Sequence, residues 1–228
     1  MSESPFVVEV WSDVVCPWCY IGKRRLESAL ADFEHRDQVE VIWRSFELDP
    51  TTPRSTEPGG GGDLATYLGD KYGGGREAGL AMNAQVSQIA AGDGLDYHLE
   101  RAVRSNTVDA HRLLHLAFQT GGPTLQGALK ERVLAAYFSE GSAIDDPATL
   151  LRLATEVGLD PARVEQVLGS TEFADEVRQD VAQARAYGAT GVPFVVVDGR
   201  YGVSGAQPAE LFGQALRRAW EDRVAATG

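Results

Sequence analysis

The chain contains few of the residues that several common functions require. Its 228 residues include only two cysteines and four histidines, and 21 Lys and Arg against 33 Asp and Glu. The formal charge of −12 argues against nucleic-acid binding, because too few cations remain to neutralise phosphates in bulk. No apolar run approaches the ~20 residues needed to cross a bilayer, so we expect no membrane partner.

The N-terminus also lacks the features of a secretory signal. Its first residues, MSESPFVVEV, contain no basic segment and no long apolar segment before the first predicted strand. We therefore expect a cytoplasmic protein. In a reducing compartment a pair of cysteines is more often catalytic or redox-sensing than a structural cross-link.

The two cysteines lie in one short segment, CPWC at residues 16–19. Before it, residues 6–11 are rich in valine and aromatic side chains, which is typical of a strand. After it, residues 20–33 repeat apolar side chains at helical spacing. The segment is therefore predicted to lie where a strand gives way to a helix.

This placement predicts a reactive first cysteine. Cys16 is expected at a helix N-terminus, where backbone N–H groups without intrahelical partners and the helix dipole favour a thiolate. Pro17 suits the first helical position, because its missing N–H costs nothing there. Cys19 follows one turn later, within reach of a disulfide with Cys16. The pattern favours a redox-active pair.

Two other interpretations of the segment are weaker. A structural zinc site needs four ligands, and the histidines show no zinc-finger spacing relative to the cysteines. The histidines are His35, His98, His111 and His115. We therefore expect no metal. The second alternative, two buried cysteines that only pack, stays open because a free cysteine behaves as a small apolar side chain.

The order of predicted elements points to an α/β fold with an interruption. A strand, a helix and a further strand over residues 39–46 form a βαβ unit, and after a Pro/Gly-rich loop at 51–62 about six helices follow. Strand character returns at residues 193–197, and Asp198-Gly199 is a strong hairpin signal before a short strand and a last helix. This βαβ…ββα order is that of a thioredoxin-like fold with an all-helical insertion.

The corresponding domain division is discontinuous. We predict a thioredoxin-like domain made of residues 1–50 and 186–228, and a helical insertion domain of residues 63–185. The loop at 51–62 joins them.

A proline opens the first of the late strands, in the segment GVPF at residues 191–194. A proline at that point calls for a reason. A cis peptide bond between Val192 and Pro193 supplies one, and its combination with the CPWC segment favours it. The alternative is a trans proline at the start of an edge strand.

Four segments taken together resemble one family. CPWCYIGK, SNTVDAHRL, ATGVPFVV and VSGAQP, in this order, are similar to the FrnE-type dithiol-disulfide oxidoreductases, a cytoplasmic bacterial subgroup of the DsbA-like branch of the thioredoxin superfamily. The resemblance covers nearly the whole chain. It implies that Cys16 attacks, that Cys19 resolves the intermediate, and that Pro193 is a cis-proline facing both. It adds no metal or tightly held cofactor.

The resemblance also implies partners and a binding surface. Protein or small-molecule thiols and disulfides are the expected substrates, and glutathione is a candidate co-substrate. A bound substrate is expected to contact Pro17 and Trp18 and to pair its backbone with Val192. Of the two aromatic residues that flank the cysteines, Trp18 and Tyr20, one is expected to pack and the other to line a groove.

Two departures from the family pattern affect the expected chemistry. Related proteins often carry a buried acid at the position of Val10, and Glu9 should point to the opposite face of the strand, so the proton acceptor for Cys19 is unassigned. Periplasmic oxidants have histidine at the place of Trp18. Because tryptophan carries no charge, we expect a less oxidising pair than theirs.

The segment SNTVDAH at residues 105–111 opens a predicted helix and admits two interpretations. In the first, Asn106 or Thr107 caps the helix and Asp109 is favoured by the helix dipole. In the second, Asn106 and His111 line the cleft between the insertion and the sheet, as the resemblance implies.

Two other functions compete with a thiol-disulfide oxidoreductase. One is a glutathione-dependent isomerase or transferase of the 2-hydroxychromene-2-carboxylate isomerase or kappa type, in which serine usually replaces the first cysteine. The presence of both Cys16 and Cys19 counts against it. The other is a redox-sensing interaction protein whose insertion changes shape with the state of the disulfide.

Overall fold

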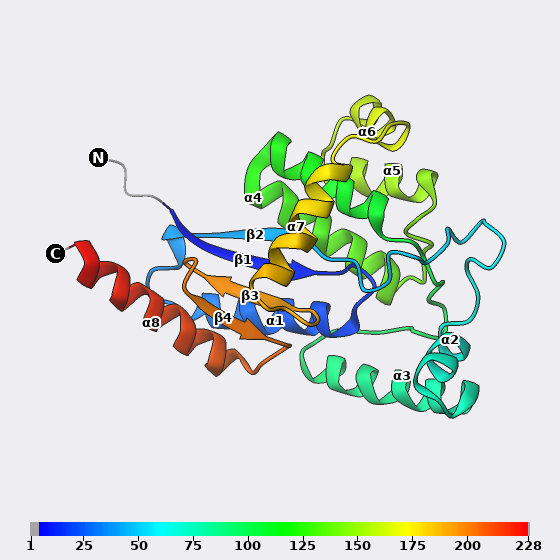
Figure 1. Ribbon diagram of the computed structural model, residues 1–228, viewed down its shortest axis with the longest axis horizontal. Coiled ribbons are helices and arrows are strands. Elements are labelled where there is room, and N and C mark those ends of the chain that lie inside the picture. The colour runs from blue at the N-terminus through cyan, green and yellow to red at the C-terminus, as the bar shows by residue number, and fades with distance from the viewer. Residues whose placement is uncertain (1–4, 228) are drawn as a thin grey trace.

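The computed structural model describes residues 5–227 and contains one four-stranded mixed sheet in that range (Figure 1). Its strands are β1 (Phe6–Ser12), β2 (Val39–Ser45), β3 (Phe194–Val197) and β4 (Tyr201–Ser204). They are arranged in the order β2-β1-β3-β4. The strand β1 runs parallel to β2 and antiparallel to β3, which pairs antiparallel with β4. Both ends of the chain therefore build the sheet, and the predicted α/β class is confirmed.

Helices surround this sheet and fill the long interval between β2 and β3. The helix α1 (Pro17–Ala31) and the short 3-10 helix η1 (Arg36–Gln38) connect β1 to β2, and α8 (Ala209–Thr227) follows β4. Between β2 and β3 lie α2 (Leu64–Tyr72), α3 (Gly75–Gly92), α4 (Val108–Phe138), α5 (Pro147–Glu156), α6 (Pro161–Leu168) and α7 (Ala174–Ala186). Their number agrees with the sequence pattern, while the division into two domains stays a prediction.

The longest of these helices is broken inside. In α4 the backbone leaves helical geometry at Gly121 and Gly122, and Gly122 has a φ of 65°. A positive φ is easily reached only by glycine, and Pro123 follows, which cannot donate a backbone hydrogen bond. The Gly-Gly-Pro sequence thus divides α4 into two arms.

The two faces of the sheet are covered by different helices. Alternate residues of β1 point to opposite faces. Phe6, Val8 and Val10 share one core with side chains of α1 and α8, whereas Trp11 packs with Ala184 of α7 on the other face. Figure 1 shows α7 crossing the sheet. The sheet is the middle layer of a three-layer arrangement, which fixes the position of the β1–α1 junction.

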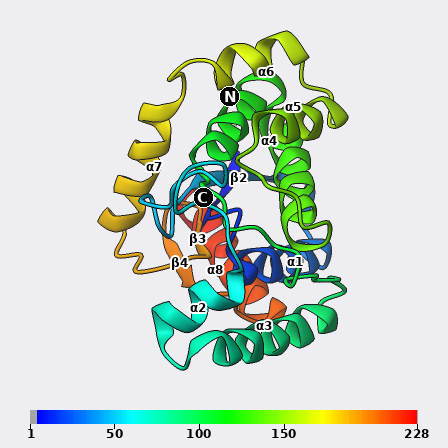
Figure 2. The same cartoon turned by 90° about the vertical axis from the view of Figure 1, so that its right-hand side faces the viewer.

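The helical segments hold this junction from two sides. Figure 2 shows α4 on one side of α1 and the pair α2 and α3 on the other. Val14, Tyr20 and Ile21, which surround the cysteine pair in sequence, belong to the same core as buried residues of α4, α5 and α6. The cysteine segment is therefore anchored in the core of the helical block as well as in the sheet.

The outer edge of β2 is closed by side chains rather than by another strand. The Trp43 backbone N–H donates to Oε1 of Gln126 in α4, and the Gln126 side-chain amide donates to the Trp43 carbonyl, both at 2.9 Å. The Ser45 N–H donates to Oδ2 of Asp180 in α7 at 2.8 Å. Because an open sheet edge readily recruits another strand, these bonds both protect the edge and dock α4 and α7 on it.

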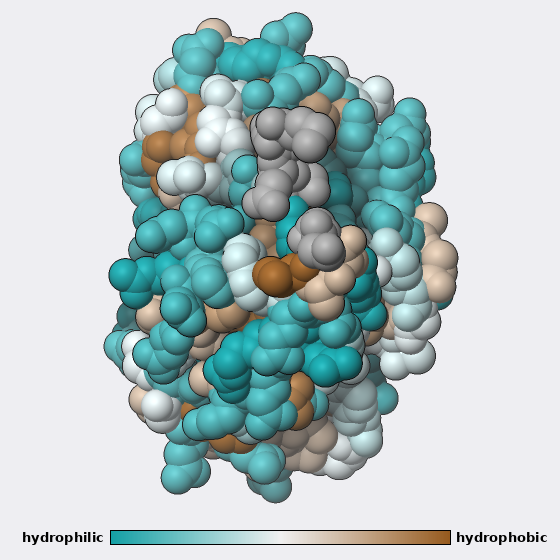
Figure 3. Space-filling model, turned by 90° about the vertical axis from the view of Figure 1, so that its left-hand side faces the viewer, coloured by the Kyte–Doolittle hydropathy of each residue, from teal (hydrophilic) through white to brown (hydrophobic). Residues whose placement is uncertain are grey.

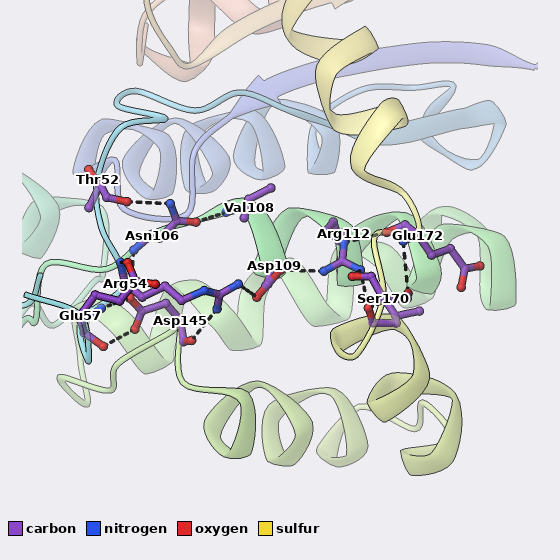
Figure 4. A network of polar contacts seen from close by, with 12 residues as sticks. Thr52, Arg54, Glu57, Asn106, Val108, Asp109, Arg112, Asp145, Ser170 and Glu172 are labelled. Carbon is purple, nitrogen blue, oxygen red and sulfur yellow. Dashed lines mark hydrogen bonds and ion pairs between the residues drawn. The ribbon is translucent and has the colours of Figure 1, made fainter.

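A polar network ties the Pro/Gly-rich loop to the helices (Figure 4). Arg54 forms an ion pair with Asp109 at the start of α4 and donates to the carbonyl of Asp145. Asp109 Oδ1 also accepts a hydrogen bond of 2.7 Å from Arg112, which donates in turn to the Glu172 carbonyl. The start of α4 is therefore held in place from both sides.

The surface at the end of the molecule shown in Figure 3 is mostly hydrophilic, with apolar residues in small, scattered groups. Among residues 5–227, no helix has the combination of length and apolar character required to span a membrane.

Candidate active site

The two cysteines occupy different positions at the junction of β1 and α1. Cys16 is the residue that precedes the first turn of α1, and Pro17 occupies the first turn. The Cys19 N–H donates to the Cys16 carbonyl at 3.0 Å, which places both residues in the same turn. Cys19 is only 1% exposed, whereas Cys16, at 3%, lines a pocket. Both are free thiols in this structure, and Cys16 is the one that faces the pocket.

The loop before β3 lies directly against the first cysteine. The peptide bond between Val192 and Pro193 is cis. The Cys16 thiol donates to the Val192 carbonyl, with 3.6 Å between sulfur and oxygen. The ring of Pro193 packs against Gly22 of α1 so closely that a Cβ on Gly22 would lie 2.9 Å from Cγ of the proline. The absent side chain of Gly22 thus lets the loop approach α1.

A pocket of about 600 Å³ opens beside Cys16. Its walls come from the cysteine segment, from α2 and α3, from the loop after β2, and from Gly191 and Val192. Most of the lining is apolar, and its charged members are the cations Lys71 and Arg104 and the acids Asp13 and Asp49. Nε of Arg104 is buried without a hydrogen-bond partner in the described part of the chain. Three predicted binding residues, Pro17, Trp18 and Val192, line this pocket.

The structure distinguishes the two aromatic residues that flank the cysteines. Trp18 is 42% exposed and lines the pocket. Tyr20 is buried and donates through its hydroxyl to Glu131 Oε1 at 2.6 Å. Burial and the neighbouring Glu131 raise the pKa of Tyr20, so it stays a neutral donor. Tyr20 therefore packs, and Trp18 is the residue that a substrate can contact.

Two residues expected in the cleft do not line it. The Asn106 side chain donates to the Thr52 carbonyl at 2.7 Å and accepts from the Val108 N–H at 3.0 Å (Figure 4). His111 is fully buried and lies 3.2 Å from Asp13 Oδ1 through Nε2. The expectation that these two line the cleft is corrected. Asn106 accepts from the first N–H of α4, while Thr107 is the N-cap residue and its side chain makes no capping hydrogen bond; residues 105 and 107 line the pocket.

The partner of His111 is a residue that the sequence analysis did not identify. Asp13 is 1% exposed, and its carboxylate accepts from the backbone N–H groups of Val14 and Leu48, each at 2.8 Å. Asp13 thereby connects the cysteine loop, the loop after β2 and α4. Its sequence signal was only its place three residues before Cys16.

Cys19 lies in an environment that opposes ionisation. Burial raises the pKa of its thiol well above the usual value, and the hydrogen bond and charge of Cys16 raise it further. Lys130 and a hydrogen bond from the Asp13 backbone act in the opposite direction. Glu9, the acid nearest in sequence to Val10, bonds to Arg44 at 2.7 Å on the α7 side of the sheet. Glu9 therefore does not serve Cys19.

Glu131 fastens α4 to α1 beside the cysteines. Its carboxylate accepts from Lys23 and Tyr20, both at 2.6 Å, and pairs with Arg24. Burial by itself would raise the pKa of Glu131, but the hydrogen bonds from Arg24, Lys23 and Tyr20 outweigh it and lower the pKa to about 2.

This depressed pKa predicts a pH-dependent contribution to stability. An unfolded glutamate titrates near ~4.3, so the stabilisation by Glu131 is present above that pH and is lost as the pH falls toward about 2. We expect Glu131→Gln to lower the free energy of unfolding at pH 7, and the difference from wild type to shrink below pH ~4. Urea unfolding across this pH range measures it, with the exposed Glu34→Gln as control. A difference that stays constant with pH would contradict the assignment.

Within the described residues, no group of three or more His, Cys, Asp or Glu side chains is arranged to hold a metal ion.

A protein-family model and a sequence relative each match most of this chain. The model of the DSBA-like thioredoxin domain family matches residues 7–217. The uncharacterized protein YwbO of Bacillus subtilis is 27% identical over 214 residues, which cover 92% of this chain and 94% of YwbO. These matches extend over both the cysteine segment and the late strands.

Solved structures with the same fold include one at substantial sequence identity. The crystal structure of a probable DsbA oxidoreductase from Streptomyces coelicolor is 45% identical, covers 95% of this chain and 90% of its own, and superposes with a TM-score of 0.87. The cytosolic disulfide reductase DsbM from Pseudomonas aeruginosa, solved with glutathione, is 18% identical, with coverage of 96% and 99% and a TM-score of 0.63. At that identity DsbM shows the shared fold alone.

Proposed function

Because the chain belongs to the family of DsbA-like thioredoxin domains, we propose that it is a dithiol-disulfide oxidoreductase that uses Cys16 and Cys19. The observation that supports this most directly is the asymmetry of the pair. Cys16 precedes the first turn of α1 and faces the pocket, while Cys19 is buried within the same turn. This arrangement suits a dithiol mechanism, which needs one thiol that the substrate can reach and a second thiol that is protected. The expected membership of the DsbA-like branch is thereby confirmed, and the narrower FrnE-type assignment stays a prediction.

The exchange runs through a mixed disulfide. A substrate thiolate attacks Cys16 Sγ of the oxidised pair, the bond between the cysteines breaks, and Cys19 leaves as the reduced thiol after taking up a proton. A second substrate thiolate attacks the substrate sulfur of the mixed disulfide and releases Cys16. In the opposite direction the Cys16 thiolate attacks a substrate disulfide and Cys19 closes the pair. The Val192 carbonyl beside Cys16 is positioned to accept a backbone hydrogen bond from a bound peptide.

We further propose glutathione as a small-molecule substrate. The pocket beside Cys16 is large enough for a tripeptide. Lys71 and Arg104, of which Arg104 also pairs with Asp49, suit the carboxylates of glutathione. The structural similarity to DsbM, a cytosolic protein solved with glutathione, is consistent with this substrate and with a cytoplasmic location.

Equilibration in glutathione buffers of defined potential tests the function. We expect one intramolecular disulfide to form between Cys16 and Cys19, seen as a two-electron transition when free thiols are trapped and counted by mass spectrometry. A potential near −270 mV would favour a reductase, and one near −120 mV would favour an oxidant. Because Trp18 stands where periplasmic oxidants have histidine, we expect the potential to lie below about −120 mV. If no intramolecular disulfide forms at any potential, the function is wrong and the isomerase class takes its place.

The redox-sensing alternative has its own test. Hydrogen exchange in α2 to α7, compared between the reduced and oxidised forms, should differ only near Cys16 if the protein is an enzyme. A change spread over these helices, together with redox-dependent partner binding, would favour a sensor.

A further inference from the structure

The most unusual charged side chain of the described residues lies behind the cysteine pair. Lys130, on the second arm of α4, is fully buried. Its Nζ donates to the Ser12 carbonyl at 3.3 Å and lies 5.7 Å from the centre of the Trp43 ring. Within the described part of the chain no carboxylate lies within ion-pair distance of Nζ. Lysine is almost never buried without a charged partner, so this position calls for an explanation.

Burial without a carboxylate partner makes the amine easy to deprotonate. Desolvation lowers the pKa of Lys130 to about 8, although the negative charges of Cys19, Asp13 and Cys16 act to raise it. The positive charge of Lys23 lowers it slightly further. Of the titratable groups that act on Lys130, Cys19 and Lys23 lie on α1, and Asp13 and Cys16 lie in the loop between β1 and α1. Lys130 can therefore exchange a proton near neutral pH.

Lys130 and Cys19 meet the same peptide group. Nζ of Lys130 donates to the Ser12 carbonyl, and the Asp13 N–H at the other end of that peptide acts on the Cys19 thiol and lowers its pKa. Lys130 is also the cation whose charge lowers the pKa of Cys19. Lys130 and Cys19 therefore both interact with the Ser12–Asp13 peptide, and both are buried and lie outside the lining of the pocket.

The chemistry of the resolving step requires a group at this place. Once Cys16 is joined to a substrate, Cys19 must lose its proton in a buried environment before its sulfur can attack. Val10 has no ionisable group, and Glu9 is bonded to Arg44 on the other face of the sheet. Of the groups that shift the pKa of Cys19 within the described residues, Lys130 is the amine that can take a proton near neutral pH.

We propose that Lys130 accepts the proton of Cys19 when Cys19 resolves the mixed disulfide. The neutral amine takes the thiol proton and becomes an ammonium. The sulfur electron pair of Cys19 forms the bond to Cys16 Sγ, the bond between Cys16 and the substrate sulfur breaks, and the substrate leaves as a thiolate. In the reverse direction the ammonium returns the proton to Cys19. This proposal rests on the proposed dithiol function.

The experiment separates the two halves of the reaction with the aromatic disulfide 5,5′-dithiobis(2-nitrobenzoate). Attack by Cys16 on an excess of this probe releases a first coloured thiolate, and attack by Cys19 on the mixed disulfide releases a second. Stopped-flow absorbance follows both in the reduced full-length protein. The variant is Lys130→Met, which preserves length and apolar packing. The matched control is Lys23→Met, because Lys23 is also buried and lies 6.0 Å from the same Trp43 ring, but pairs with Glu131.

At pH 7 we expect Lys130→Met to slow the second phase by at least about tenfold and to change the first phase by less than about threefold. Lys23→Met should change the ratio of the two phases by less than about twofold, because the charge of Lys23 has the smallest of these effects on the pKa of Lys130. In the wild-type protein the second phase should accelerate with pH and level off near pH 8, whereas in Lys130→Met it should keep rising beyond ~pH 9. Loss of packing alone would slow both phases or lower stability without moving this pH profile.

Other outcomes overturn the assignment. An unchanged second phase in Lys130→Met, or the same pH profile in variant and wild type, would show that Lys130 is not the proton acceptor. If Lys130→Met does not fold, the wild-type profile decides, because a second phase independent of pH between 6 and 9 overturns the proposal. Release of only one thiolate by the wild-type protein would instead refute the dithiol function itself.

Discussion

Replacing Cys16 by serine is expected to abolish disulfide exchange, with a loss on the order of 1,000-fold or more, because the attacking sulfur is removed. Cys19 cannot substitute for it, since Cys19 is buried and does not line the pocket. Reduction of glutathione disulfide or of a peptide disulfide, followed with a coupled assay, measures the loss.

The matched variant Cys19→Ser should behave differently. Cys16 still attacks, but no second thiol releases the substrate, so a mixed disulfide should accumulate. Mass spectrometry after incubation with glutathione disulfide should show one added glutathione on Cys19→Ser and none on Cys16→Ser. Exchange activity that survives in Cys16→Ser and disappears in Cys19→Ser would reverse the roles of the two cysteines.

The second large effect is expected at Asp13. Its buried carboxylate accepts from the backbone N–H groups of Val14 and Leu48 and faces the buried His111. Asp13→Ala leaves these groups without their acceptor, and we expect a loss of about 3 kcal/mol in the free energy of unfolding. Chemical denaturation measures it.

Two further variants identify the cause of that loss. Asp13→Asn keeps one acceptor oxygen and should lose less stability than Asp13→Ala. Asp70→Ala, at an exposed position of α2, should change the free energy of unfolding by less than ~0.5 kcal/mol. Equal losses for the alanine and asparagine variants of Asp13 would mean that the hydrogen bonds are not responsible.

The features that the sequence predicted correctly depend on local chemistry. The strand and helix around residues 16–19 and the Asp198-Gly199 hairpin follow from side-chain periodicity and from the backbone freedom of glycine. These properties act between neighbours in the chain, so they can be seen before the fold is known.

The sequence was least informative where the role of a residue depends on what packs against it. His111 has the spacing of a residue at the start of a helix, and nothing in that spacing reveals that Asp13 covers it. In the same way, Trp18 and Tyr20 are both aromatic neighbours of the cysteines. Only the contact with Glu131 decides that Tyr20 is the one that packs.

By itself, the sequence determined the α/β class, the order of the elements and the cysteine pair at the start of a helix, because periodicity, turn chemistry and motif spacing are properties of short segments. The tertiary structure decided which cysteine faces the pocket, which residues line it, and that Lys130 lies behind Cys19. The reason is physical. The contacts that bury a side chain and shift its pKa come from α4, β1 and β2, which are distant in the chain and adjacent only after folding.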